Sequence, residues 1–100
     1  MTTWHAKTPA AHDFLAAATA DPAAVLIALD FDGTLAPIVD DPETSAMQPE
    51  AAKALAELGP KVGHVAIITG RPVAKVRELG RLERRAGLGG VIVLGQYGAE

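Results

Sequence analysis

Apolar residues gather in three short runs along this chain. The first run, residues 25–29, is too short for a typical helix, holds two β-branched residues and ends abruptly in charge. It therefore predicts a strand that is buried on both faces of a sheet. Residues 65–68 and 91–94 repeat the pattern, and each of these ends in a glycine-containing turn. We predict strands over roughly 25–30, 65–68 and 91–94.

Between the runs, apolar residues recur at helical spacing. Three helices are predicted, over 10–20, 49–58 and 72–80, and each has a proline at or next to its first turn. Gly59-Pro60 ends the second helix and Gly80 ends the third, as glycine commonly does at a helix C-terminus. Residues 1–8 are expected to form a loose tail, and residues 81–86 are expected to add one or two helical turns.

A long irregular segment, residues 33–47, follows the first strand. Prolines and a pair of aspartates interrupt it, while Leu35, Ile38 and Val39 are apolar, so we expect it to fold back over part of the domain. A loop of this length beside acidic residues at a strand end is more often functional than idle.

Apart from that segment, strands and helices alternate along the chain. Such alternation with short connections predicts an α/β domain whose parallel strands are joined by right-handed crossovers. The 100 residues are enough for one small domain. We assign residues 1–24 to the tail and first helix, and residues 25–100 to the core domain.

Composition narrows the class of protein. Hydrophobic residues make up 49% and charged residues 21% of the chain, as in a globular domain. A net charge of -3 gives no sign of a nucleic-acid partner or of binding to an acidic membrane surface. Because no apolar stretch is long enough to span a bilayer and cysteine is absent, we expect a cytoplasmic protein without a membrane partner.

Two carboxylates mark the end of the first strand. Asp30 and Asp32 lie where open α/β sheets build their sites, and Gly33 lets the backbone turn sharply there. A carboxylate at such a position can bind Mg²⁺ together with phosphate and water, or attack phosphorus as a nucleophile. The second carboxylate can then serve as general acid and base, and Thr34 adds a hydroxyl.

Turn chemistry alone is an alternative explanation of Asp32-Gly33. It does not explain why Asp30 places a charge at the end of a buried strand. A calcium-binding EF-hand loop is rejected, because a count from Asp30 puts Leu35 where the invariant glycine belongs.

The second strand also ends in residues suited to an anion. Thr69-Gly70 provides a hydroxyl and backbone N–H groups just before a predicted helix, and Arg71 adds a cation that could reach phosphate. In a parallel sheet this strand end lies beside the Asp30 strand end, so both would form one site. The alternative is a plain helix cap at Thr69 and a solvated Arg71.

The stretch Leu29-Asp30-Phe31-Asp32-Gly33-Thr34-Leu35 resembles the first signature of the haloacid dehalogenase superfamily, whose members are mostly Mg²⁺-dependent phosphatases. The resemblance implies a Rossmann-like three-layer fold with a parallel sheet. It implies that Asp30 is the nucleophile, that Asp32 is the acid and base with its backbone carbonyl on the metal, and that Thr34 supports the loop near the phosphate. Thr69 matches the superfamily's second signature.

Looser motifs resemble the trehalose-6-phosphate phosphatase family. They are Ala36-Pro37-Ile38-Val39, Pro42, Thr69-Gly70-Arg71-Pro72 and the closing Gly95-Gln96-Tyr97-Gly98-Ala99-Glu100, where relatives often have His in place of Tyr97. This resemblance covers about residues 25–100 and implies hydrolysis of trehalose 6-phosphate to trehalose and phosphate through an aspartyl-phosphate intermediate. The alternatives are a phosphatase for another sugar phosphate, or a non-catalytic domain that binds phosphate or a partner.

The resemblance also implies elements that this sequence does not contain. The superfamily uses a later lysine, a later acidic pair and, in phosphatases of this type, a cap domain. We therefore expect the chain to be an N-terminal fragment with half of the core, and to be inactive alone. We also expect the Asp30 strand to form an open apolar edge, which favours self-association.

Overall fold

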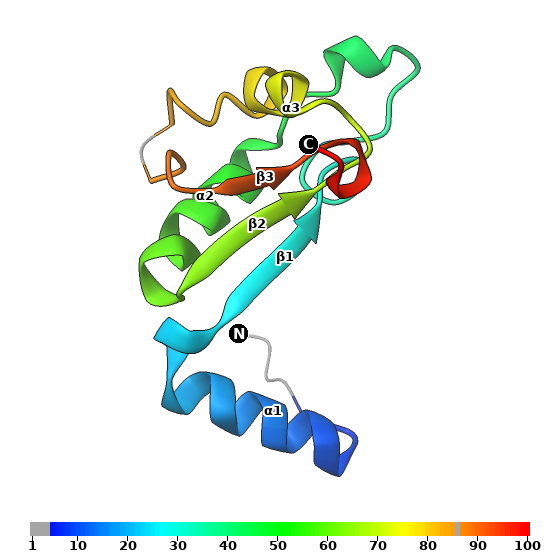
Figure 1. Ribbon diagram of the computed structural model, residues 1–100. Helices are drawn as coiled ribbons and strands as arrows, with labels where there is room; N and C mark the ends of the chain where they lie inside the picture. The colour runs from blue at the N-terminus through cyan, green and yellow to red at the C-terminus, as the bar shows by residue number, and fades with distance from the viewer. Residues whose placement is uncertain (1–4, 86) are drawn as a thin grey trace.

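The structure is a computed structural model that describes residues 5–85 and 87–100 (Figure 1). Within these residues the α-helices are α1 (Pro9–Ala20), α2 (Pro49–Leu58) and α3 (Val73–Gly80), and the strands are β1 (Leu26–Asp30), β2 (His64–Ile68) and β3 (Ile92–Leu94). Short 3₁₀ helices η1 (Pro22–Ala24), η2 (Pro42–Thr44), η3 (Gly59–Lys61) and η4 (Gln96–Gly98) lie in the connections. Residues 1–4 of the predicted tail and residue 86 of the predicted helical extension lie outside the described residues.

The strands form one parallel sheet in the order β1-β2-β3. Ile27 pairs with Val65 and Ile67 pairs with Val93, so the carboxyl ends of the strands meet at one edge of the sheet. The predicted α/β class with a parallel sheet is confirmed, and each predicted strand and helix is present close to its expected bounds.

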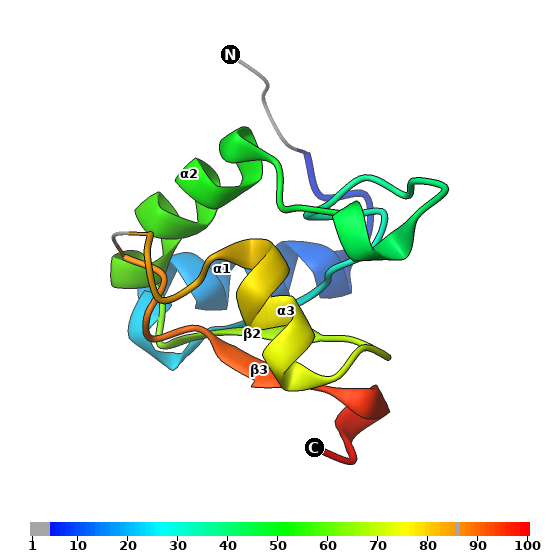
Figure 2. The same ribbon diagram turned by 90° about the horizontal axis from the view of Figure 1, so that it is seen from above.

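Helices α2 and α3 cover one face of the sheet (Figure 2). Their inward residues, such as Leu55 and Val76, join Val65, Ile67 and Val93 of the strands in a single hydrophobic core. Of the three layers that the resemblance implies, the described residues thus supply the sheet and one helical layer, which is a partial Rossmann-like fold.

Strand β1 is not buried on both faces, which corrects the prediction. Leu26 exposes 59% of its surface, and exposed residues alternate along β1 with half-buried ones. Two causes combine: β1 lies at an edge of the sheet, as predicted, and no described helix packs on the sheet face opposite α2 and α3. Ile68, Ile92 and Leu94 are exposed on this same open face.

Helix α1 stands apart from the sheet (Figure 1). Thr8 caps it, because its Oγ1 accepts a hydrogen bond from the Ala11 N–H at 3.1 Å, and Pro9 is its first residue. No residue of α1 is buried. The radius of gyration, 14.8 Å, exceeds the value of about 13 Å typical of a 100-residue domain, as an outlying helix implies. None of the described helices is long and apolar enough to cross a membrane.

The irregular segment 33–47 folds back onto the core, as predicted. Leu35 and Met47 are buried, and the Gln48 N–H donates to the Leu35 carbonyl at 2.9 Å. Ile38 remains exposed, so the apolar residues of this segment do not all enter the core.

Residues 81–84 form turns, and the predicted helical turns are absent from residues 81–85. The helix α3 ends at Gly80 because Arg81 adopts the left-handed conformation, with φ of 50°. The chain then turns back toward β3.

Candidate active site

A tight loop after β1 fixes both predicted acidic residues. Phe31 is fully buried, and its carbonyl accepts N–H groups from Leu35 at 2.9 Å and Ala36 at 3.0 Å. Gly33 has φ of 83°, a left-handed conformation that glycine adopts without strain. The buried phenyl ring therefore anchors the loop, while the carboxylates on either side of it stay at the surface.

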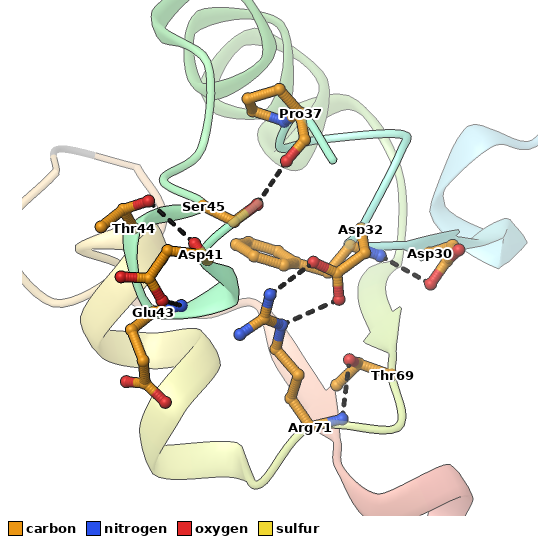
Figure 3. Close-up of polar contacts among 10 residues, drawn as sticks. Asp30, Asp32, Pro37, Asp41, Glu43, Thr44, Ser45, Thr69 and Arg71 are labelled. Atoms are coloured by element: carbon orange, nitrogen blue, oxygen red, sulfur yellow. Dashed lines mark hydrogen bonds and ion pairs between the residues drawn. The ribbon is translucent and has the colours of Figure 1, made fainter. Parts of the chain in front are cut away.

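Asp30 is the last residue of β1, and it is exposed. Its Oδ1 accepts a hydrogen bond from the Phe31 N–H at 2.9 Å (Figure 3). Among the described residues, no lysine, arginine or histidine lies within ion-pair distance of this carboxylate. Asp30 can therefore accept a ligand or attack one without first leaving a cationic partner.

Asp32 is held by Arg71 from the end of β2. The Arg71 Nε donates to Oδ2 and Nη2 donates to Oδ1, both at 2.8 Å, so the guanidinium forms a bidentate ion pair with the carboxylate (Figure 3). The side chains are 16% exposed for Arg71 and 36% for Asp32. The hydrogen bond from Arg71, opposed by partial burial and aided by its charge, holds the pKa of Asp32 below its usual value. The solvated Arg71 of the alternative interpretation is therefore wrong.

Thr69 closes the turn between β2 and α3. It is 2% exposed, and its Oγ1 accepts the Arg71 N–H at 3.1 Å. This bond places the Arg71 backbone, and the guanidinium then reaches across to β1.

The predicted anion site at a helix N-terminus differs in detail from the structure. Helix α3 begins at Val73, and the Val73 N–H donates to Glu100 Oε1 at 2.5 Å. This donor is therefore occupied. The backbone N–H groups of Asp32 and Gly70 have no hydrogen-bond partner among the described residues, so the loops after β1 and β2 each offer a free donor.

Thr34 lies at the surface of the loop after β1. Its N–H donates to the Phe31 carbonyl at 3.3 Å, which is a turn contact. The structure thus brings Asp30, Asp32, Thr69 and Arg71 together (Figure 3) and leaves Thr34 beside them on the loop.

The end of β3 joins the same edge, which the sequence reasoning missed. The Tyr97 N–H donates to the Thr69 carbonyl at 2.8 Å, and the Gln96 N–H donates to the Arg71 carbonyl at 2.9 Å. A Cβ on Gly95 would lie 2.8 Å from the Arg71 carbonyl oxygen, so only glycine allows this approach. The glycines at 95 and 98 follow the third predicted strand, just as glycines follow the first two. This shared pattern could have indicated that the third strand end belongs to the same site.

Lys75 on α3 forms its ion pairs away from these strand ends. It forms an ion pair with Glu43 of η2 and lies 3.7 Å from Glu78. The hydrogen bond to Glu43 raises the pKa of Lys75. This pair ties α3 to the irregular segment and does not supply a cation to the loop of Asp30.

The carboxylates offer a limited set of metal ligands. No cluster of three or more metal-ligating side chains occurs in residues 5–85 and 87–100. Both oxygens of Asp32 bind Arg71, which leaves Asp30 as the available carboxylate. Mg²⁺ is commonly held by one or two carboxylates, with phosphate and water completing its shell, so this donor set fits Mg²⁺.

The profile of the trehalose-phosphatase family matches residues 28–91, which include the loops after β1 and β2. The chain belongs to the trehalose-phosphatase family. The parallel sheet and the family together identify the fold as a partial haloacid dehalogenase-like core of Rossmann type.

The chain also resembles individual members of this family in sequence. The chain is 38% identical over 71 residues to the trehalose-phosphate phosphatase of Mycobacterium tuberculosis (strain ATCC 25618 / H37Rv), which is 71% of this chain and 16% of that protein. It is 41% identical over 71 residues to the proteins of the same name from Mycobacterium marinum, with 16% of that protein covered, and Mycobacterium leprae, with 15% covered. The chain therefore spans only about a sixth of the length of the curated relatives that it matches.

Proposed function

We propose that this chain forms the nucleophile-bearing part of a phosphatase that hydrolyses trehalose 6-phosphate to trehalose and phosphate. The observation that carries the proposal is the exposed Asp30 carboxylate, on a strand end that adjoins the free N–H group of Gly70. The trehalose-phosphate phosphatases that the chain resembles share this region of sequence, which supports the choice of substrate.

Asp30 would act as the nucleophile. One carboxylate oxygen attacks phosphorus, the bond from phosphorus to the sugar oxygen breaks, and the sugar alkoxide takes a proton from Asp32. Water then attacks the aspartyl phosphate while Asp32 removes its proton, which releases phosphate and restores Asp30. The free N–H groups of Asp32 and Gly70 would stabilise charge on the phosphoryl oxygens, with Thr69 and Thr34 as further hydroxyls nearby.

Mg²⁺ is the cofactor that we propose, held by the Asp30 carboxylate and the Asp32 carbonyl. When bound, it would neutralise the phosphate charge that otherwise repels the nucleophile.

The pair of Arg71 and Asp32 must open during this reaction. In the structure both oxygens of Asp32 accept bonds from Arg71, and these bonds lower the pKa of Asp32, so the carboxylate is held ionised without a proton to give to the sugar oxygen. A guanidinium can bind phosphate in the same bidentate arrangement as it binds a carboxylate. We therefore propose that Arg71 moves from Asp32 to the phosphate when substrate enters, which frees Asp32.

The test is phosphate release from trehalose 6-phosphate by the protein translated from the whole reading frame that contains these residues. Release should require Mg²⁺ and should be abolished in Asp30→Asn, while Asp40→Asn, an exposed carboxylate in the irregular segment, should retain it. Activity that survives Asp30→Asn would refute the assignment. Faster release from another sugar phosphate would favour the second candidate substrate class, and phosphate binding without release would favour a non-catalytic domain.

Residues 1–100 alone are expected to release no phosphate, since the later lysine and acidic pair of the superfamily are not among them. A cytoplasmic location and self-association through the exposed edge of the sheet at β1 also belong to the proposal. The exposed apolar residues of that sheet support self-association.

A further inference from the structure

The turn after β3 holds two consecutive residues in the left-handed conformation. Gln96 has φ of 48° and Tyr97 has φ of 54°. Residues other than glycine rarely adopt this conformation, and such residues gather at ligand sites, where the surrounding structure holds them in place. Here the Tyr97 N–H donates to the Thr69 carbonyl at 2.8 Å, and the Glu100 N–H donates to the Gly95 carbonyl at 3.1 Å.

This backbone directs the Tyr97 side chain over the loop after β2. A Cβ built on Gly70 would lie 2.5 Å from Cζ and 2.7 Å from Oη of Tyr97, so the phenol end of the ring rests on Gly70. The rest of the ring is open, because Tyr97 is 88% exposed, more than any other large hydrophobic side chain in the described part of the chain. The ring is thus fixed at one end and free over most of its surface.

Gly70 lies within the candidate phosphate site. Its N–H has no partner among the described residues, and it stands between Thr69 and Arg71. A phosphate ester bound there would carry its organic group away from the loop, past the nearest side chains at the strand ends. Tyr97 is the aromatic side chain in contact with this loop.

We infer that Tyr97 determines specificity by binding the sugar ring of the phosphorylated substrate, an inference that rests on the proposed function. The open face of the phenol ring would pack against the C–H bonds of the sugar. The hydroxyl would bond to a sugar hydroxyl. Aromatic side chains with a few polar groups are the usual lining of sites for small molecules, and tyrosine combines an apolar ring with a polar end.

The test follows the ring of Tyr97, the one tyrosine within residues 1–100. The protein translated from the whole reading frame that contains these residues is labelled with ¹³C-tyrosine, and the Tyr97 signals are assigned as those absent from Tyr97→Phe. NMR then follows this ring during titrations with inorganic phosphate, glucose 6-phosphate and trehalose 6-phosphate, each with Mg²⁺. The same titrations give dissociation constants for Tyr97→Ala and Tyr97→Phe. Phe14→Ala is the matched control, because it removes an exposed aromatic ring from α1, away from the strand ends.

Tyr97→Ala should weaken binding of the sugar phosphates about three- to tenfold, the loss expected for one aromatic contact. Inorganic phosphate should bind the variant as it binds the wild-type chain, and Tyr97→Phe should keep most of the sugar affinity. The Tyr97 signals should shift further with a sugar phosphate than with phosphate alone, and Phe14→Ala should change none of these values.

Two results would overturn the inference while leaving the proposed function intact. In the first, Tyr97→Ala binds sugar phosphates as the wild-type chain does. In the second, it loses affinity for inorganic phosphate and sugar phosphates equally, which would make Tyr97 a support of the phosphate loop only. A wild-type chain that binds neither phosphate nor sugar phosphates would overturn the proposed function together with this inference.

Discussion

Replacing Arg71 with methionine should lower the free energy of unfolding by about 1–2 kcal/mol, because the change removes both hydrogen bonds to Asp32. Exposed ion pairs contribute at most about 1 kcal/mol, and breaking buried pairs costs about 3–5 kcal/mol. With side chains 16% and 36% exposed, this pair lies between those cases, and solvent screens part of it. Each kcal/mol corresponds to about 4–8 °C in the melting temperature of a domain of this size.

This loss should depend on pH in a defined direction. The pKa of Asp32 is lower in the folded chain than in the unfolded chain, because Arg71 donates a hydrogen bond to the ionised carboxylate. The contribution of the pair is therefore complete above the unfolded-state pKa of about 3.9, and it is lost as pH falls through the lower folded-state pKa. Arg71→Met should thus cost more at neutral pH than in acid.

Urea unfolding followed by circular dichroism at about pH 7 and about pH 3 measures this difference. Asp32→Asn and the double variant complete a cycle, whose coupling energy should be about 1 kcal/mol at neutral pH. Lys75→Met is the matched control, since it removes a cation from the more exposed pair with Glu43 and should cost less than about 1 kcal/mol. A coupling energy of zero, or an Arg71→Met penalty equal at both pH values, would refute the reasoning.

Further variants test the loop after β1 and the open sheet. Phe31→Ala should cost about 3–5 kcal/mol of unfolding free energy in urea titrations, because Phe31 is fully buried, whereas Ile38→Ala should change it by less than about 0.5 kcal/mol. Gly33→Ala should cost about 1–2 kcal/mol by the same assay, because φ there is 83°; an unchanged midpoint would contradict this. Ile92→Lys should raise the monomer fraction in sedimentation velocity, since Ile92 lies exposed on the open face; a wild-type chain that is already monomeric would contradict it.

The helices and strands were predictable because their signals are local. The apolar run at 65–68 became the central strand β2, and the proline and glycine at the ends of α2 act within a few residues of it. The acidic pair was also visible, since Asp30 and Asp32 carry charge directly after an apolar run. Burial of β1 was predicted wrongly because it depends on what packs against the strand, and Leu26 faces a side of the sheet that no described helix covers.

The side-chain contacts between strand ends in the candidate site could not be predicted from the sequence. Arg71 and Asp32 are 39 residues apart, and their hydrogen bonds exist because β1 and β2 are neighbours in the sheet. The occupied N–H of Val73 depends in the same way on Glu100, which reaches α3 only through the turn after β3. Neither contact follows from the spacing of residues along the chain.

The central claim, that Asp30 is the nucleophile, is tested most directly by trapping the phosphorylated protein. The protein translated from the whole reading frame containing these residues is mixed with Mg²⁺ and acetyl phosphate, whose good leaving group needs little help from Asp32. Peptide mass spectrometry after acid quenching then locates the phosphoryl group. We predict that it lies on Asp30, accumulates in Asp32→Asn because hydrolysis is slowed, and is absent from Asp30→Asn. A phosphoryl group on another residue, one that persists in Asp30→Asn, or none in the wild-type protein would contradict the claim.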